Sequence, residues 1–222
     1  MIISIFDYGS GNIKSVSKAL ESAANSLQKN VSVQVIHDPK KIKEADKIIL
    51  PGQGSFKQCA QHLRGIPGVV DELNDFVLNK KKNIFGICVG MQLFADFGEE
   101  DGGSKGLGWI QGEVKKIKIT NLELKLPHMG WNEIVLKESN PLFQNLSEDK
   151  HFYFVHSYEF IAQDQINVAA STFYQDEITV AVFKDNIFGT QFHPEKSQKN
   201  GIQILENFIS WYYYDYLSSH RS

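Results

Sequence analysis

Residues 83–94 read NIFGICVGMQLF, an apolar run that passes through a glycine-flanked cysteine into a segment of helical character. The apolar run predicts a buried strand at 83–87, and the residues after 88 predict a helix. The same alternation precedes this stretch, since we expect strands at 2–6, 32–36 and 47–50 and helices at 12–29 and 68–81. Strands that alternate with helices are typical of βαβ units, so this half of the chain predicts a largely parallel sheet.

From residue 109 onward the pattern changes, because strand-like runs follow one another without intervening helices. We expect strands at 110–119, 133–137, 152–155, 158–161, 178–183 and 187–192, and a final helix at 201–217. Strands joined without crossover helices pair antiparallel. No repeat or Pro/Ser-rich linker divides the chain, so we expect a single domain over residues 1–222 with an α/β fold and an antiparallel extension in its second half.

The composition limits the kinds of partner and compartment. The 222 residues are 42% hydrophobic and 22% charged, and the formal net charge of -3 gives no electrostatic reason to expect nucleic acid. No apolar run reaches the roughly 18 residues that a membrane span needs, so we expect a soluble, cytoplasmic protein without membrane contact. A chain of this size with two cysteines needs no disulfide framework. At least one thiol is therefore available for chemistry.

Cys88 is the first candidate for catalysis. It follows the expected strand between Gly86 and Gly90, a pattern typical of a nucleophile elbow, in which glycines let neighbouring elements approach a strained turn. The start of the next helix favours a thiolate, and the amide of Val89 can bond an oxyanion. The alternative is a small buried hydrophobe, because free cysteine is often buried. Cys59 has no such surroundings, and we expect it to pack within a helical segment.

A thiol nucleophile also needs a base and a group that orients the base. Residues 191–195 read QFHPE at the end of an expected strand. In extended backbone His193 and Glu195 point the same way, and Pro194 stiffens the link between them. Glu195 would then orient the imidazole and stabilise its charged form. A surface His-Pro-Glu turn is the alternative, because the order of residues does not show that Cys88 and His193 meet.

Two glycine-rich loops follow early strands. Residues 50–55 read LPGQGS, and their amides can complete an oxyanion hole, although such a loop is also an ordinary strand-to-helix turn. Residues 9–12 read GSGN and lack the third spaced glycine of a dinucleotide site, so we expect no cofactor there. His151 and His156 form the only close histidine pair, and no cysteine or acidic cluster with metal-ligand spacing accompanies them, so we expect no metal.

The segments at 50–55, 86–90 and 191–195 resemble, in order and spacing, the class I (triad) glutamine amidotransferases over nearly the whole chain. This resemblance implies a three-layer, flavodoxin-like fold and a triad of Cys88, His193 and Glu195. Four blocks look like the glutaminase subunits of imidazole glycerol phosphate synthases, namely DYGSGN at 7–12, PHMGWNE at 127–133, YFVHSY at 153–158 and HPEKS at 193–197. The PHMGWNE block is the most specific, because it separates this family from relatives that serve GMP, anthranilate or pyridoxal phosphate synthesis.

The resemblance implies an activity and a partner. Glutamine would be hydrolysed to glutamate and ammonia. A separate cyclase subunit, a (βα)₈ barrel, would use the ammonia to form imidazole glycerol phosphate and aminoimidazole carboxamide ribotide in histidine biosynthesis. The expected assembly is a heterodimer of the two subunits, and no metal or cofactor is implied.

The resemblance also assigns individual positions. Glutamine is expected against the oxyanion residues Gly52, Gln53, Gly54 and Val89 and against Gln92, Glu100, His156, Ser157 and Tyr158. A carboxylate such as Glu100 can hold the substrate ammonium. The positions that match cyclase-facing residues are Asn12, Met129, Trp131 and Lys184. Without the resemblance, Asn12 is more simply a helix cap, Trp131 a core residue and Lys184 a charge at the end of a hairpin.

Two positions depart from the family pattern. Gln53 stands where the family usually has valine, and Val89 stands where it usually has leucine. Both positions act mainly through backbone amides, so we expect activity to survive, while the gating of the oxyanion loop stays open.

Three other functions remain as alternatives. The same fold could serve an amidotransferase that modifies a sugar or sugar nucleotide with a related barrel partner, act as a γ-glutamyl peptidase, or bind ligands without catalysis. The PHMGWNE block argues against the peptidase, and the intact residue types of the triad argue against a non-enzymatic module.

Overall fold

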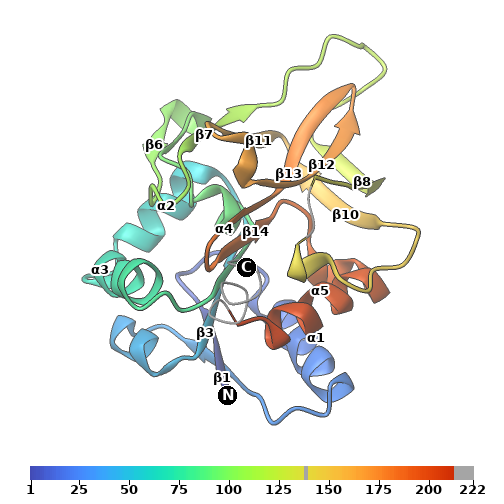
Figure 1. Ribbon diagram of the computed structural model, residues 1–222. Coiled ribbons are helices and arrows are strands. Elements are labelled where there is room, and N and C mark those ends of the chain that lie inside the picture. Colours follow the sequence, from blue (N-terminus) through green and yellow to red (C-terminus); the bar gives the residue numbers. More distant parts are fainter. Residues whose placement is uncertain (138–139, 213–222) are drawn as a thin grey trace.

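The computed structural model describes residues 1–137 and 140–212, and an eight-stranded sheet runs through its centre (Figure 1). The strands are β1 (Ile2–Phe6), β2 (Ser32–Ile36), β3 (Lys47–Gly52), β4 (Ile84–Cys88), β9 (Val135–Leu136), β12 (Val168–Tyr174), β13 (Asp176–Lys184) and β14 (Ile187–Thr190). They lie in the order β2-β1-β3-β4-β14-β13-β12-β9, and the first five run parallel. The last three are each antiparallel to the strand before them. The predicted parallel sheet with an antiparallel extension is confirmed, and the parallel part has the flavodoxin-like strand order.

Two smaller sheets come from residues 97–162. One pairs β8 (His128–Glu133) with β10 (His151–His156). The other contains β5 (Phe97–Gly98), β6 (Ser104–Lys105), β7 (Gly112–Lys116) and β11 (Tyr158–Ala162) in the order β11-β7-β5-β6. Figure 1 shows β8 and β10 beside the antiparallel end of the large sheet.

Helices cover both faces of the large sheet. They are α1 (Ile13–Ser26), α2 (Phe56–Arg64), α3 (Val69–Asn74, continued by a π-helical turn at Asp75–Asn79), α4 (Val89–Gln92) and α5 (Gln198–Ser210). Short 3₁₀ turns lie at Pro39–Glu44, Glu100–Gly102, Pro141–Phe143, Gln165–Asn167 and Pro194–Lys196. In Figure 1, α1 and α5 pack together on one face of the sheet, while α2 and α3 lie on the other, which gives three layers.

The sequence of α1 shows why a helix forms there. The side-chain oxygen of Asn12 accepts a hydrogen bond from the amide of Ser15 at 3.4 Å, so Asn12 caps the first turn. Val16, Leu20 and Ala23 recur at helical spacing and are buried. The helix therefore has a capped start and one apolar face turned to the sheet.

The core lies on both faces of β3 and β4, whose residues are all buried. Strands covered on both faces read as continuous apolar runs, as these do. The ring of Phe85 on β4 lies 4.9 Å from that of Phe188 on β14 and 5.4 Å from that of Phe208 on α5. Burial of each ring contributes about 1.5–3 kcal/mol, so this cluster fastens α5 to the strand that ends in Cys88.

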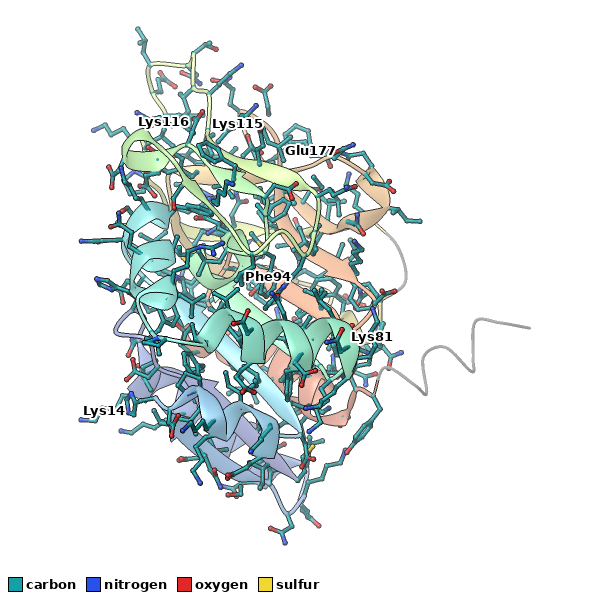
Figure 2. All side chains as sticks on the ribbon, turned by 90° about the vertical axis from the view of Figure 1, so that its left-hand side faces the viewer. Lys14, Lys81, Phe94, Lys115, Lys116 and Glu177 are labelled. Carbon is teal, nitrogen blue, oxygen red and sulfur yellow. The ribbon has the colours of Figure 1, made fainter. Side chains whose placement is uncertain are left out.

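Charged side chains from several elements project from the outside of the molecule (Figure 2). Phe94, which is fully buried, lies inside, whereas Lys14, Lys81 and Lys115 project from the outside at separate places (Figure 2). The lysines come from different elements, so these positions do not form one basic face.

Several element boundaries differ from the prediction. β12 was not expected, because the small residues of VAASTFY at 168–174 weaken the alternation of a strand. β8 begins at His128 rather than near 133, since its glycine and asparagine are poor strand formers. The predicted final helix begins earlier, at Gln198, and ends at Ser210, because Trp211 is extended. The predicted helical residues 213–217 lie outside the described residues.

The fold brings two strand ends together at one edge of the sheet. Gly52 at the end of β3 is in register with Cys88 at the end of β4. In open sheets of this type, ligands bind at the carboxyl ends of the parallel strands. No helix in the part of the chain that the structure describes is both long and apolar enough to cross a membrane.

Candidate active site

Cys88 occupies a strained turn between β4 and α4. Its φ of 57° and ψ of -117° lie outside the regions that L-residues favour, as expected at a nucleophile elbow. A Cβ added at Gly86 would lie 2.7 Å from the Met91 nitrogen, and one added at Gly90 would lie 1.9 Å from the Leu50 oxygen. The two glycines therefore permit the close backbone approach that holds the turn in place.

The helix after Cys88 is shorter than expected. α4 ends after 4 residues, so the partial charge of a long helix contributes little to the stabilisation of a thiolate, which corrects that expectation. Val89 is the first helical residue, where a backbone N–H has no partner within the helix. That N–H remains the donor expected beside the sulfur.

The oxyanion loop, Gly52, Gln53 and Gly54, lies directly against the elbow. A Cβ added at Gly52 would lie 2.5 Å from the Gly90 nitrogen and 2.9 Å from the Val89 carbonyl carbon, so only glycine fits there. Gly54 has a φ of 106°, which side chains rarely allow. The loop backbone therefore reaches the elbow with no side chain in between.

His193 and Glu195 form a buried pair. Nδ1 of His193 lies 2.8 Å from Oε1 of Glu195, and the side chains are 7% and 2% exposed. The backbone is not extended as predicted, because β14 ends at Thr190 and Pro194–Lys196 forms a 3₁₀ turn. The Ser197 hydroxyl donates to the His193 carbonyl at 2.6 Å and fixes this turn.

His193 and Cys88 line the same cavity, and the sulfur affects the pKa of the imidazole. Burial lowers this pKa, but the neighbouring Cys88 sulfur and the Glu195 carboxylate raise it more, to about 10. Nε2 of His193 is buried and has no hydrogen bond of good geometry within the described residues, so it is the ring atom available to the thiol. Such bonds are often long in a protein without substrate. The structure therefore brings together the two residues that the sequence left apart.

One cavity of about 250 Å³ opens at Cys88 and His193. Of the residues expected to contact glutamine, Gly52 does not line this cavity. Five that lie outside the oxyanion group line it, namely Gln92, Glu100, His156, Ser157 and Tyr158. The rest of the wall consists of Gln53, Gly54, Val89, Pro127, Val155, Gln191 and Lys196. A concave pocket with a few convergent polar groups is the usual form of a small-molecule site.

Glu100 has a structural contact as well as a place in the wall. Its Oε2 accepts a hydrogen bond from the amide of Phe56 at 2.7 Å, in the first turn of α2. Burial raises the pKa of Glu100, the bond from Phe56 lowers it, and Asp101 raises it, with a net increase. One carboxylate oxygen therefore caps a helix while the residue borders the cavity.

Gln191 is a wall residue that the sequence analysis did not single out. Its Nε2 lies 3.6 Å from the Cys88 sulfur, and its Oε1 accepts a hydrogen bond from Gln92 at 2.9 Å. The available signal was its position two residues before His193. Sequence reasoning missed it because a glutamine next to a candidate base has no chemistry of its own.

Lys196 is the second such residue. It is exposed at the cavity wall, and its Nζ lies 5.5 Å from the centre of the Tyr153 ring, a cation–π distance. The HPEKS block contains Lys196, but its charge alone did not distinguish it from the other lysines.

Three of the expected partner-facing residues lie near the cavity. Met129 and Trp131 are 62% and 48% exposed on β8, the strand that follows Pro127 of the cavity wall. Asn12 follows Gly11, where an added Cβ would lie 3.4 Å from the nitrogen of Gly52 in the oxyanion loop. Asn12 also caps α1, so the structural alternative holds for it as well.

Lys184 lies elsewhere. It pairs with Ile187 across β13 and β14, and Ile187 pairs with Ile84, at the opposite end of β4 from Cys88. Its Nζ donates to the Trp109 carbonyl at 3.1 Å. The expected grouping of Lys184 with the other three residues is therefore corrected, and the hairpin-end alternative describes its position.

The described histidines do not assemble a metal site. Within residues 1–137 and 140–212, no three His, Cys, Asp or Glu side chains gather as ligands. His151 pairs with Asp149, and Nδ1 of His156 lies 2.9 Å from the Tyr158 carbonyl oxygen.

This chain is a member of the class-I glutamine amidotransferase family, whose model (Glutamine amidotransferase class-I) matches residues 5–211. Within that class it belongs with the imidazole glycerol phosphate synthase subunits HisH. The HisH of Pelagibacter ubique (strain HTCC1062) is 49% identical over 95% of this chain and 100% of its own length. The HisH of Brucella suis biovar 1 is 43% identical over 95% of this chain and 99% of its own length.

Solved structures agree on the fold. A glutamine amidotransferase crystal structure matches with a TM-score of 0.71 and 16% identity over 95% of this chain and 98% of that chain. A glutamine amidotransferase from Thermotoga maritima matches with a TM-score of 0.63 and 15% identity over 99% of this chain and 84% of that chain.

Proposed function

We propose that this protein hydrolyses glutamine with Cys88 as the nucleophile and His193 and Glu195 as its activating pair, and that it supplies the ammonia to a cyclase subunit in the synthesis of imidazole glycerol phosphate. The observation that carries the proposal is the convergence on one cavity of a strained cysteine and a buried His–Glu pair with a 2.8 Å contact. The HisH relatives support the assignment of the ammonia to this synthesis, because they are named as subunits of imidazole glycerol phosphate synthase.

The first step uses the pair of Cys88 and His193. The imidazole takes the thiol proton, and the thiolate attacks the amide carbon of glutamine, which forms a C–S bond and places a negative charge on the former carbonyl oxygen. The amides of Val89 and of the oxyanion loop stabilise that charge. The glycine contacts between loop and elbow support this arrangement, since they let backbone donors approach the sulfur.

Proton release then follows from the charges around His193. The Cys88 sulfur is one of the groups that raise the pKa of His193 to about 10. Once the sulfur is bonded to carbon its charge is gone, and burial lowers the pKa of the imidazole, which becomes a better acid. His193 protonates the departing nitrogen as the C–N bond breaks, and ammonia leaves a thioester.

The second half reverses these roles. Neutral His193 removes a proton from water, whose oxygen adds to the thioester carbon. Collapse of that adduct breaks the C–S bond, releases glutamate and restores the thiolate beside the imidazolium. Glu195 keeps the ring oriented throughout.

Substrate placement follows from the cavity wall. We assign Glu100 to the α-ammonium of glutamine, since a carboxylate is the natural partner of that group. Gln92 and the backbone of residues 156–158 border the same space and are assigned to the remaining polar groups. No cofactor takes part in this scheme.

The ammonia has to reach its acceptor unprotonated. Free ammonia in water near neutral pH is largely ammonium, which is not a nucleophile, so a covered passage to the acceptor is needed. The exposed apolar side chains of Met129 and Trp131 on β8 are suited to a protein partner, and the exposed Lys196 lies in the cavity wall. We assign this face to a (βα)₈-barrel cyclase in a heterodimer. We place the complex in the cytoplasm, where free thiols such as Cys59 and Cys88 persist.

The decisive experiment for the nucleophile is glutamate release by Cys88→Ala in the presence of the cyclase and its ribonucleotide ligand. The variant should show no turnover above background. Cys59→Ala removes the other cysteine of the chain, on α2, and should keep most of the turnover. Undiminished glutamate release by Cys88→Ala would refute the assignment.

The coupling to the partner is tested by the rate of glutamate release with and without the cyclase and its ligand. The isolated chain should be a poor glutaminase, and the full mixture should be strongly faster. Met129→Ala and Trp131→Ala should weaken this stimulation while the isolated chain keeps its thermal stability. Equal rates with and without the cyclase would show that the partner is a different one, such as a sugar-modifying synthase.

A further inference from the structure

A line of buried hydrogen bonds starts on β8 and enters the cavity wall. The Asn132 amide nitrogen lies 3.2 Å from Nε2 of His128, and Nδ1 of His128 lies 2.9 Å from Nε2 of His156. Nδ1 of His156 lies 2.9 Å from the carbonyl oxygen of Tyr158. The two histidines are 3% and 6% exposed, so water does not compete for these bonds.

The protons on this line have one consistent arrangement. The Asn132 side chain donates to the Phe173 carbonyl at 2.9 Å and accepts from the Glu133 amide at 2.8 Å, which fixes the orientation of its amide group. Nε2 of His128 must then accept, so its Nδ1 donates to His156, whose Nδ1 donates in turn to Tyr158. This order requires both rings to be neutral, and burial lowers the pKa of His128 to about 4 and that of His156 to about 3.

The line continues from the Tyr158 carbonyl to the nucleophile. Nε2 of Gln92 donates to that carbonyl at 3.3 Å and to Oε1 of Gln191 at 2.9 Å. Nε2 of Gln191 then donates to the Cys88 sulfur at 3.6 Å. Gln92 and Gln191 are 3% and 0% exposed. Because its oxygen is engaged by Gln92, Gln191 can only present its N–H group to the sulfur.

Every bond in this series has a fixed donor and a fixed acceptor, and its last donor serves the reacting atom. Hydrogen bonds of this kind to a charged acceptor are stronger than neutral ones and favour the charged form. The bond from Gln191 therefore stabilises a thiolate and fixes the direction in which it lies. The outer end of the series lies on β8, the strand that exposes Met129 and Trp131 on its other side.

We propose that Gln191 and His128 are positioning residues at two points of this buried hydrogen-bond chain, and that the chain orients and activates the Cys88 sulfur. The proposal deepens the proposed function, since it concerns the same nucleophile. It gives a role in the chemistry to His128, which does not line the cavity.

The test measures alkylation of Cys88 by iodoacetamide from pH 5 to 9, located by peptide mass, together with the kinetics of glutamate release. Gln191→Leu should slow alkylation at pH 7 by about tenfold and move its pH midpoint upward, because the thiolate loses a donor. It should lower kcat by a similar factor while KM for glutamine changes by less than about threefold. An unchanged alkylation profile in Gln191→Leu would overturn the proposal. Alkylation needs no glutamine, so this outcome is separate from a failure of the proposed glutaminase activity.

A second comparison asks whether His128 acts through the same chain. His128→Phe keeps a ring between Phe154 and Tyr174, which both lie within stacking distance, and removes the hydrogen bonds. Its effect on alkylation should be smaller than that of Gln191→Leu, and the double variant should be no slower than Gln191→Leu alone. Effects that multiply in the double variant would mean that the two residues act independently and would overturn the proposal.

A nearly isosteric substitution tests the donor-to-acceptor direction of the hydrogen-bond chain without creating a cavity. Asn132→Asp replaces the donor at the outer end by an acceptor, which forces His128 to reverse its protons and leaves two acceptors facing each other at Tyr158. This variant should slow Cys88 alkylation several-fold. The matched control is Asn207→Asp on α5, which also loses amide bonds to two backbone carbonyls, those of Leu142 and Gln144, away from the cavity. Equal alkylation rates for the two variants, both folded by thermal denaturation, would overturn the role of the chain.

Discussion

Oε1 of Glu195 contacts Nδ1 of His193 at 2.8 Å, while the other carboxylate oxygen, Oε2, is buried without a hydrogen bond to any described residue. A buried carboxylate ordinarily gathers several donors. Here the imidazole of His193 is the hydrogen-bond partner that the structure shows for the Glu195 carboxylate. The charge of Glu195 is therefore directed almost wholly at His193.

The first prediction removes that charge while keeping the shape. Glu195→Gln should lower kcat for glutamate release by about 10²–10⁴-fold, because an amide neither stabilises the imidazolium nor fixes its tautomer as a carboxylate does. Steady-state kinetics with the cyclase present measure the effect. Glu44→Gln, at an exposed pair with Lys41, is the control and should match the wild type. A kcat for Glu195→Gln within threefold of wild type would contradict the triad.

The second prediction concerns the proton on His193. In the wild type the pKa of His193 is about 10, since Cys88 and Glu195 together outweigh the lowering by burial. In Cys88→Ala only Glu195 opposes burial, so the pKa should fall well below that value. NMR titration of the imidazole signals in the two proteins checks this. An unchanged titration midpoint would show that the Cys88 sulfur does not raise the pKa of the His193 imidazole.

These two predictions rest on residues that the sequence identified. The elbow at Cys88 and the pair of His193 and Glu195 were recognisable because glycine spacing and residue type are local properties of the chain. The contact between Cys88 and the pair of His193 and Glu195 could not be predicted from the sequence. It depends on β4 and β14 being neighbouring strands, although about a hundred residues of sequence separate them. Gln191 and His128 were missed for a related reason, because a hydrogen-bond chain has no periodic signature.

The fold shows the same difference between features set by local sequence and features set by long-range pairing. The buried strands β3 and β4 were predicted because continuous apolar runs are unambiguous. The start of β8 was misplaced and β12 was missed. Pairing with neighbouring strands, rather than their own composition, stabilises both in the extended conformation. Lys184 was misassigned by resemblance alone, and only the register of β13 and β14 shows which edge of the sheet it occupies.

The third prediction is a loss of stability in mild acid. Burial lowers the pKa of His128 to about 4 and of His156 to about 3, both below the value of about 6.5 in an unfolded chain. The unfolded state then binds more protons than the folded state between these values, so the free energy of unfolding falls as pH drops from about 6.5 toward 4. Urea unfolding at several pH values should show a shallower fall for His128→Gln than for the wild type. Equal slopes for His128→Gln and the wild type would count against this account.

The fourth prediction tests the contact behind the elbow. Gly90→Ala places a methyl group 1.9 Å from the Leu50 carbonyl oxygen, so backbone must move. We expect a loss of about 3 kcal/mol or more in unfolding free energy, together with loss of activity. Gly65→Ala, at an exposed helix end where the nearest atom is 3.0 Å away, should cost about 1 kcal/mol or less. Chemical denaturation compares the two, and similar losses would show that the approach at Gly90 is not the cause.

The fifth prediction concerns Lys47, a buried lysine at the start of β3. Nζ of Lys47 donates to the carbonyls of Phe208 at 2.7 Å and Ile209 at 2.9 Å, and also to that of Trp211, at the end of α5. Lys47→Met removes the hydrogen bonds to Phe208 and Ile209, while the Trp211 carbonyl keeps one from the Asn83 side chain at 2.9 Å. The change should lower the free energy of unfolding at pH 7 by about 2–4 kcal/mol. Lys18→Met, on the exposed side of α1, is the control for loss of a surface charge.

The pH dependence of the same comparison has a definite sign. Burial, with a further contribution from Lys29, lowers the pKa of Lys47 to about 7, although Asp46 opposes the change. The unfolded chain keeps this proton up to about pH 10.4, so it binds more protons than the folded state above pH 7. The stability of the wild type relative to Lys47→Met should therefore grow from pH 7 to 9. A constant difference over that range would show that Lys47 does not titrate there.

The placement of Lys184 has a practical consequence. The turn at residues 184–186 lies at the edge of the sheet opposite Cys88, away from both the cavity and the exposed face of β8. A dye, an affinity handle or a surface tether attached at Asp185 would sit on the far side of the molecule from every group assigned to chemistry or to the cyclase. Single-molecule and immobilised assays of ammonia transfer can therefore be built on that turn without blocking the route they are meant to observe.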